Sequence, residues 1–142
     1  MDSSIEFGRN ISLVYHNYRK FVAEQLGDLE NFTPGWVPYL KVISRNQGIV
    51  FEDLSKRLMV SKPAITKTIR QLELEGLCDL QNHPTDKRSK KIYLTEKGNT
   101  VLENINPILR EIQNNVLRGL SVDEIKKLDE VFEKILNNIT NK

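Results

Sequence analysis

The residues best suited to chemistry lie between positions 83 and 98, in the stretch HPTDKRSKKIYLTEKG. Four of the five residues from 87 to 91 are lysine or arginine, and a short alternating strand pattern follows them. Because no catalytic pair stands at a usable spacing here, and no phosphate loop occurs in the chain, the sequence does not indicate an enzyme. Positive charge gathered at one hairpin tip instead predicts that this segment binds an anion.

A second group of cations and hydroxyls lies just upstream, in the segment SKPAITKTIR at 61–70, which has no acidic residue. Apolar residues at 65, 69 and 72 predict a helix that buries one face, because they recur at i, i+4 and i+7. The opposite face suits the major groove of double-stranded DNA, where cations and hydroxyls meet phosphates and base edges. The helix N-terminus adds a partial positive charge. The residues of this face and N-terminus are Ser61, Lys62, Pro63, Thr66, Lys67 and Arg70.

The basic hairpin predicts a second contact with the same partner. Its tip can straddle the phosphate backbone or enter a narrow minor groove, where arginine is favoured electrostatically. We expect the acid of the tip, Asp86, to orient Arg88 by a charge-assisted hydrogen bond. Two alternatives stay open: the lysines form an ordinary solvated loop, or the basic face docks an acidic protein. The candidate DNA contacts of the tip are Asp86, Lys87, Arg88 and Lys90.

The elements that position these residues follow from periodicity, caps and breakers. Helices are expected at about 5–27, 34–45, 51–59, 62–75 and 96–116, and from about 122 onward. Pro38 is awkward in the second helix, so either that helix starts near Val37 or its first turn is distorted. Thr33, Ser61 and Thr95 are expected caps, and SVDE at 121–124 is a capping box.

Short strands are expected at about 49–50, 77–81 and 90–94. Two short helices with a tight turn, followed by a β-hairpin, make a winged helix-turn-helix. Pro107 lies inside the long helix after the hairpin and is expected to kink it.

Composition places the chain among single-domain globular proteins. Its 142 residues are 39% hydrophobic and 28% charged, and the formal net charge is only +2. The start MDSSIEFGRN has no apolar core, and the sequence has no apolar run long enough to cross a bilayer. A single cysteine, Cys78, excludes an intrachain disulfide. These features predict a cytoplasmic protein without a membrane partner.

The segment LSKRLMVSKPAITKTIRQLELEGL, followed by PTDKRSKKIYLTEKG, resembles the MarR family of bacterial and archaeal transcription regulators. The family pattern has Leu-Ala-x-x-Leu before the turn, Leu-Glu-x-x-Gly-Leu at the end of the recognition helix, Asp-x-Arg in the wing and Leu-Thr-x-x-Gly after it. Ser55 replaces the alanine here, whereas Asp86, Lys87 and Arg88 match the wing motif. The resemblance covers essentially the whole chain.

The resemblance implies a mainly α fold with a small β-hairpin wing. It implies one MarR-like domain over 1–142, with a winged helix-turn-helix DNA-binding lobe at 34–98 and dimerisation helices at 1–33 and 99–142. The apolar patterns of the first and last helices independently favour a dimer, because so small a lobe cannot cover them. The implied function is a sequence-specific regulator, in most members a repressor, that binds a pseudo-palindromic operator as a homodimer.

Family members often bind small aromatic or phenolic anions in a cleft between the dimerisation helices and the DNA-binding lobe, and so release DNA. The resemblance therefore implies an effector of this kind. The alternative is that the aromatic residues at helical spacing form core or dimer interface. The candidate contacts are Tyr15, His16, Tyr18, Trp36, Tyr39 and Arg45.

The remaining reactive side chains predict no further site. In the peroxide-sensing branch of the family the reactive cysteine lies in the first helix, whereas Cys78 starts a strand here. We therefore expect Cys78 to be a small buried side chain rather than a redox sensor. His16, His83 and Cys78 are far apart in sequence, so neither a metal nor another cofactor is expected.

Overall fold

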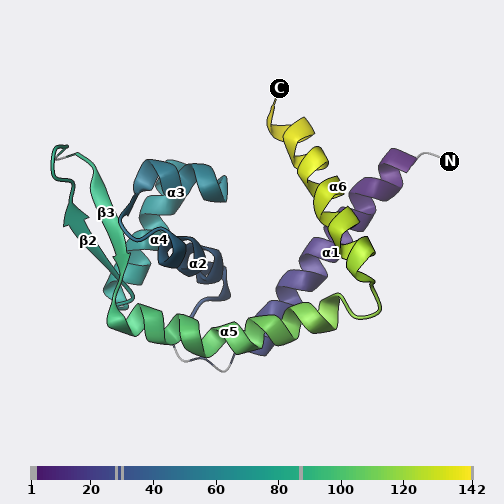
Figure 1. Ribbon diagram of the computed structural model, residues 1–142, viewed down its shortest axis with the longest axis horizontal. Helices are drawn as coiled ribbons and strands as arrows, with labels where there is room; N and C mark the ends of the chain where they lie inside the picture. Colours follow the sequence, from purple (N-terminus) through teal and green to yellow (C-terminus); the bar gives the residue numbers. More distant parts are fainter. Residues whose placement is uncertain (1–2, 28, 30, 87, 142) are drawn as a thin grey trace. The chain divides into compact units, whose positions relative to one another are not determined.

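A computed structural model describes residues 3–27, 29, 31–86 and 88–141 (Figure 1). The chain divides into two compact units, 1–108 and 109–142, and each is described by itself. The mainly helical fold with a small sheet agrees with the predicted fold class. Its elements are α1 (Ser3–Leu26), η1 (Pro34–Trp36), α2 (Val37–Arg45), β1 (Ile49–Val50), α3 (Phe51–Leu58), α4 (Lys62–Leu74), β2 (Cys78–Asn82), β3 (Lys90–Leu94), α5 (Glu96–Val116) and α6 (Val122–Thr140).

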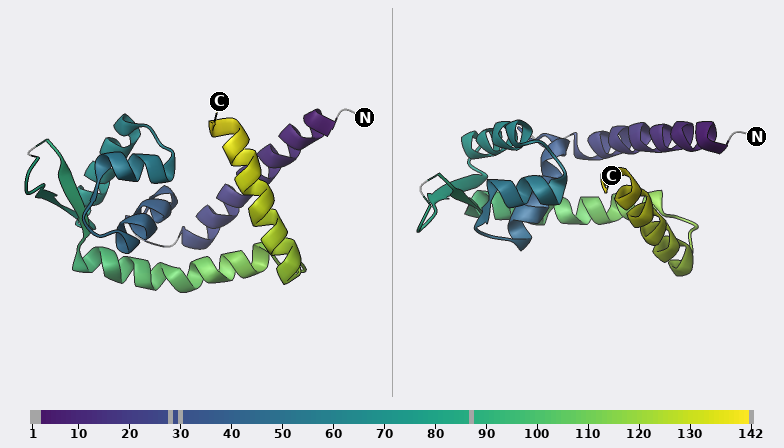
Figure 2. Two further views of the ribbon diagram at one scale, coloured as in Figure 1. Left: turned by 45° about the horizontal axis from the view of Figure 1, so that its top comes forward. Right: turned by 90° about the horizontal axis from the view of Figure 1, so that it is seen from above.

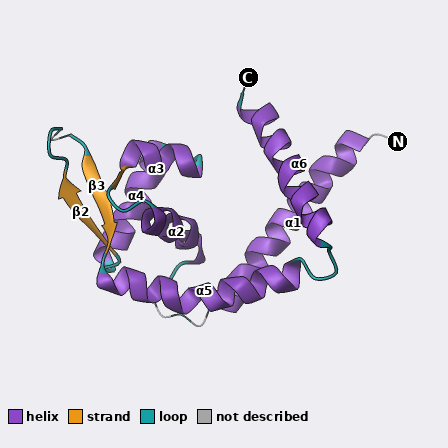
Figure 3. Cartoon of the chain, in the orientation of Figure 1, coloured by secondary structure: helices purple, strands orange, loops and turns teal. Residues whose placement is uncertain are grey.

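The first unit contains a winged helix-turn-helix. Helix α3 contacts α2 and α4, and α2 also contacts β3. The three strands form an antiparallel sheet in the order β1-β3-β2, with Ile92 paired to Ile49 on one side and to Leu80 on the other (Figure 3). In both views of Figure 2 the β2–β3 hairpin extends away from the helices of this lobe. We call this hairpin the wing.

The core of the lobe joins its helices to its sheet. Ile65, Ile69 and Leu72 of α4 are fully buried, which confirms the predicted inward face of that helix. They share the interior with buried side chains from α2, α3 and β3. The other fully buried side chains there include Leu40, Ile43, Leu54 and Ile92.

The turn between α3 and α4 fixes where the second helix begins. Met59 takes a left-handed backbone conformation with φ of 53°, and so α3 ends at Leu58. The hydroxyl of Ser55 donates a hydrogen bond to the carbonyl of Val60, and the amide of Val60 donates back to the carbonyl of Ser55. Ser61 caps α4 as predicted, because its hydroxyl accepts from the amide of Ala64 at 3.4 Å. The serine at position 55 therefore tightens the turn.

The second helix combines the two alternatives raised by Pro38. Residues 34–36 form a 3-10 turn, and the α-helix starts at Val37, which places Pro38 in its first turn. The prediction for Thr33 is wrong in one respect, because its side chain makes no capping hydrogen bond. Strand β2 begins at Cys78, one position later than expected, and Pro107 lies within α5.

The junction between the wing and α5 is tightly packed. Thr95 caps α5 as predicted, since its hydroxyl oxygen accepts from the amide of Gly98 at 3.0 Å. The amide of Thr95 donates to the carbonyl of Leu77 at 3.0 Å, which ties the end of β3 to the residue before β2. A Cβ added at Gly98 would overlap that same carbonyl. Only glycine fits where the helix crosses the start of the wing.

The second unit consists of the end of α5, a turn and α6. Gly119 has φ of 87°, a conformation that favours glycine, and it ends the turn before Ser121. The predicted capping box is confirmed: the hydroxyl of Ser121 accepts from the Glu124 amide at 3.1 Å, and the Glu124 carboxylate accepts from the Ser121 amide at 3.0 Å. No helix in the described part of the chain is long and apolar enough to cross a membrane.

Candidate nucleic-acid interface

The outer face of α4 is cationic and exposed. Lys62, Lys67 and Arg70 are exposed, while Thr66 is half-buried. The Thr66 hydroxyl donates to the carbonyl of Lys62 at 3.0 Å, so its oxygen is left to accept hydrogen bonds from a partner. An exposed helical face with three cations and an acceptor can bind phosphates and the donor groups of base edges.

The N-terminus of α4 is also open to a partner. Ser61, Lys62 and Pro63 are exposed there, and the positive end of the helix dipole attracts anions. A phosphate placed at this end would meet both the helix dipole and the Lys62 ammonium. This arrangement is suited to binding an anionic group at the start of α4.

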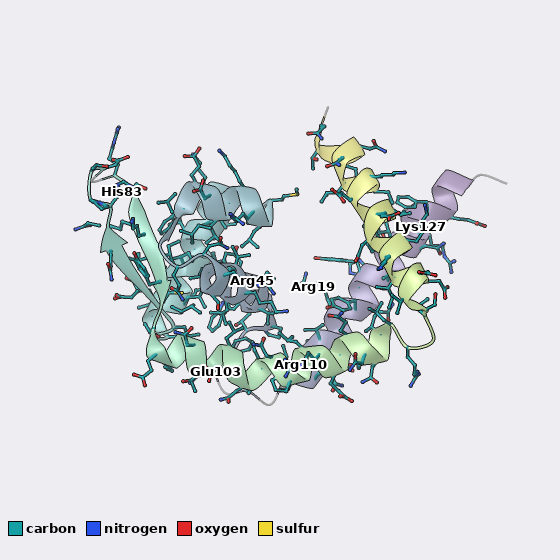
Figure 4. The ribbon with its side chains drawn as sticks, in the orientation of Figure 1. Arg19, Arg45, His83, Glu103, Arg110 and Lys127 are labelled. Carbon is teal, nitrogen blue, oxygen red and sulfur yellow. The ribbon has the colours of Figure 1, made fainter. Side chains whose placement is uncertain are left out.

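The wing presents Arg88 from residues 83–89, the loop between β2 and β3, which we call the wing loop. The Arg88 side chain is 95% exposed, and Lys90 is exposed at the start of β3. Lys87, which the sequence also predicts as a DNA contact, lies outside the described residues. Figure 4 shows His83 at the outer end of the hairpin.

Asp86 holds Arg88 differently from the expected side-chain hydrogen bond. Its Oδ1 accepts from the backbone amide of Arg88 at 3.0 Å, whereas the Nε of Arg88 is 3.7 Å away, the distance of an ion pair only. An exposed pair of this kind contributes little energy. Asp86 therefore sets the backbone of Arg88 and leaves the guanidinium free to reach a partner.

Helix α4 and the wing are neighbours in the chain and contact each other within the lobe. Helix α4 contacts β2, and Gly76 ends α4 with φ of 74° directly before the wing begins. The cationic face of the helix and the cationic loop thus belong to one compact unit.

Comparison with known proteins identifies this lobe. Residues 32–90 match the model of the MarR family. Solved structures that match nearly the full length include the transcriptional regulator BldR from Sulfolobus solfataricus (28% identity, TM-score 0.82, 96% of each chain). Another is a mutant MarR from E. coli complexed with operator DNA (25% identity, TM-score 0.87, 95% of this chain and 96% of that one). The segment 32–90 is thus similar to the MarR family, and the chain as a whole shares the fold of these regulators. An S. aureus MepR–DNA complex, at 21% identity and a TM-score of 0.87 over 94% of this chain and 98% of that one, shares the fold.

The effector candidates occupy two different environments. Trp36 and Tyr39 are buried at 7% and 8% exposure, and the indole of Trp36 donates to the Gln71 side chain at 3.3 Å. These two side chains are core residues of the lobe. Tyr15, His16 and Tyr18 lie on the exposed face of α1, and Arg45 is exposed at the end of α2.

A cleft beside the end of α4 was not foreseen from the sequence. It has a volume of about 430 Å³, and Trp36 is the one effector candidate among its lining residues. Leu74 lines this cleft and is 87% exposed, because it does not belong to the buried face of α4. That off-stripe leucine was the signal available in the sequence. The lining residues are Asn31, Phe32, Thr33, Trp36, Gln71, Leu74 and Glu75.

Cys78 has the environment of a structural side chain, as predicted. It is buried, and desolvation together with the negative charge of Glu73 raises the pKa of its thiol to about 12. The reactive thiolate is therefore scarce at neutral pH. Among the described residues, no group of three histidine, cysteine or acidic side chains is placed to hold a metal ion.

Proposed function

We propose that this protein is a MarR-family regulator of transcription that binds double-stranded DNA sequence-specifically as a homodimer. The observation that carries the proposal is the exposed cationic face of α4, which has no acid from position 61 to position 70, together with the exposed Arg88 of the wing. Helix α4 enters the major groove, where Lys67, Arg70 and Thr66 meet phosphates and base edges. The wing loop contacts the flanking backbone or minor groove. The E. coli MarR structure with operator DNA supports this mode by analogy.

The dimer is supported by apolar side chains that the single chain leaves exposed. On α1, the exposed side chains Phe7, Ile11, Val14 and Tyr18 recur at i, i+4, i+7 and i+11. On α6, the exposed side chains Val131, Phe132, Leu136 and Ile139 follow a similar pattern. Two long apolar stripes on one small soluble chain favour pairing with a second copy. The second copy supplies the second α4, so the operator is a pseudo-palindrome with half-sites about one helical turn apart.

The finer regulatory roles follow from this binding mode. We assign the protein a repressor role, because a dimer seated across two major grooves blocks access to a promoter. A small aromatic or phenolic effector releases it, and no enzymatic activity is required. The cytoplasm, where the chromosome of a bacterium or archaeon lies, is the proposed location.

The rival function is a winged helix that docks an acidic protein. Salt and sequence dependence distinguish the two, measured by fluorescence anisotropy on an operator selected from genomic DNA and on random DNA. The regulator loses affinity steeply with salt, yet binds its operator at least about a thousandfold more tightly than random DNA. Binding without base discrimination would contradict the proposal.

Substituting Lys67 tests the contact made by α4. Lys67→Ala is expected to lower operator affinity by about three- to tenfold and to reduce the salt slope by about one, because a phosphate contact is lost. Lys126→Ala removes the same exposed charge from α6 and serves as the matched control. If Lys67→Ala and Lys126→Ala behave alike in the same anisotropy titration, α4 does not face the DNA.

Substituting Arg88 tests the wing. Arg88→Ala is expected to weaken operator binding by roughly 1–3 kcal/mol, as loss of a groove arginine does. Arg118→Ala, an exposed arginine in the turn before α6, is the control and should leave affinity unchanged. Unaltered binding by Arg88→Ala would remove the wing from the interface.

A further inference from the structure

The imidazole of His83 organises the wing loop. His83 directly follows β2, and its Nδ1 lies 3.2 Å from the backbone nitrogen of Thr85 and 3.2 Å from that of Asp86. The Thr85 hydroxyl is 3.3 Å from the same nitrogen. One side-chain atom therefore accepts two backbone hydrogen bonds across the turn at Pro84, at the outer end of the hairpin (Figure 4).

The same turn is connected to Arg88 through Asp86. The Asp86 carboxylate accepts from the Arg88 amide at 3.0 Å, and the Asp86 carbonyl accepts from the Ser89 amide at 3.1 Å. The Ser89 carbonyl accepts in turn from the His83 amide at 3.1 Å. These bonds close a ring around the loop, so the place of Arg88 depends on Asp86 and the place of Asp86 depends on His83.

The two backbone hydrogen bonds fix the protonation of the His83 ring. A backbone amide can only donate, so Nδ1 must accept and carries no proton. The neutral ring then holds its proton on Nε2. An imidazolium has protons on both nitrogens and can accept neither bond. Taking up a proton therefore removes both contacts and points an N–H group at two other N–H groups.

We propose that His83 is a positioning residue of the wing: its neutral imidazole holds Asp86, and thereby Arg88, in the place where the arginine meets DNA, and the charged ring releases them. The inference rests on the proposed function for its DNA part. Histidine ordinarily changes charge between about pH 5 and pH 8. The contribution of Arg88 to operator affinity is therefore present while the His83 ring is neutral and lost when both ring nitrogens carry protons.

The surroundings of the ring contain charges of both signs. Asp86 and Arg88 belong to the same loop, and Lys90 stands at the start of β3 opposite Asn82. Lys87, in the same loop, lies outside the described residues. A proton on His83 also adds positive charge near DNA, which favours binding in general. The test therefore measures the contribution of Arg88, in which that general gain cancels.

The first experiment uses the free protein and needs no DNA. The amide resonances of Thr85 and Asp86 are followed by NMR between about pH 5 and pH 8. They are expected to shift together with the ring in the wild type. In His83→Asn they should stay constant, because the asparagine carbonyl replaces Nδ1 as an acceptor and does not titrate. If the chemical shifts of the Thr85 and Asp86 amides in the wild type do not change with pH, the proposed role of His83 is wrong.

The chain offers a matched control, because it has only one other histidine, His16. His16→Asn makes the same chemical change in α1. It should leave the pH response of Thr85 and Asp86 as in the wild type. If His16→Asn abolishes that response, His83 is not its source and the proposal fails.

The second experiment measures what Arg88→Ala costs in operator affinity in three backgrounds. At about pH 8 the cost should be about tenfold in the wild type and in His83→Asn, but only about twofold in His83→Ala. At about pH 5.5 the loss of affinity caused by Arg88→Ala in the wild type should fall to the value seen in His83→Ala. In His83→Asn that loss should stay about tenfold. Equal costs in all backgrounds at both pH values would overturn the positioning role.

The two experiments separate failure of the inference from failure of the proposed function. If Arg88→Ala costs nothing even in the wild type at about pH 8, the wing does not contact the operator and the DNA part of the inference falls with it. The amide shifts still decide whether His83 holds the turn. If the Thr85 and Asp86 amide shifts change with pH, and if Arg88→Ala lowers affinity only while the side chain at position 83 can accept hydrogen bonds, both the loop contact and its effect on DNA binding are supported.

Discussion

Phe132→Glu is expected to convert the protein from a dimer to a monomer and to lower its operator affinity by at least about a hundredfold, because the second half-site contact is lost. Phe132 is 48% exposed on the apolar stripe of α6. A charge there can stay in contact with water in the single chain, but it would be buried without a partner in a dimer, which is strongly unfavourable. Size-exclusion chromatography with light scattering gives the mass, and anisotropy gives the affinity.

The matched control is Asn137→Glu, which makes the same change in charge on the same helix. Asn137 is exposed and lies about 140° around α6 from Phe132, on the side opposite the stripe. It should remain a dimer with full affinity. A dimeric, fully active Phe132→Glu protein would refute α6 as an interface between copies.

Gly98→Ala is expected to lower the free energy of unfolding by about 3 kcal/mol, at the upper end of the cost of overpacking. The added Cβ would overlap the backbone carbonyl of Leu77, which already accepts a hydrogen bond from Thr95. A backbone atom cannot rotate away as a flexible side chain can. The start of α5 and the start of the wing must therefore separate, and the wing should also lose its effect on DNA binding. Urea denaturation measures the change in stability.

Gly35→Ala is the control for the loss of a glycine as such. A Cβ at Gly35 meets only the methyl group of Thr33, at 4.0 Å. Its free energy of unfolding should change by no more than about 0.5 kcal/mol, the range of an ordinary surface substitution. If Gly98→Ala is no less stable than Gly35→Ala, the close approach of α5 to Leu77 is not a constraint on the fold.

Most of the helices and strands could be predicted from hydrophobic periodicity and capping residues, because each of these signals depends on residues close together in sequence. The buried stripe of α4, the cap at Thr95 and the capping box at Ser121 all follow from neighbours within a few positions. Thr33 shows the limit of such rules, since a suitable cap residue before a proline makes no capping bond here. Its place was predictable, but the direction of its side chain was not.

The candidate site was predictable as a surface but not in its internal contacts. The absence of acids from 61 to 70 marked the outer face of α4 without any structure. By contrast, the hydrogen bond from the Arg88 amide to Asp86 and the two bonds accepted by His83 depend on the path of a short loop. Residue types alone do not determine that path. The cleft beside Leu74 forms because Phe32 and the end of α4, which are far apart in the sequence, lie close together in the fold.

The most direct test of sequence-specific binding is selection of sheared genomic DNA by the purified protein at near-physiological salt, followed by sequencing of the retained fragments. We expect enrichment of a short inverted repeat whose halves lie about one helical turn apart. Its genomic positions would identify the regulated genes. Uniform retention of all fragments, or retention of none, would contradict sequence-specific binding by a dimer.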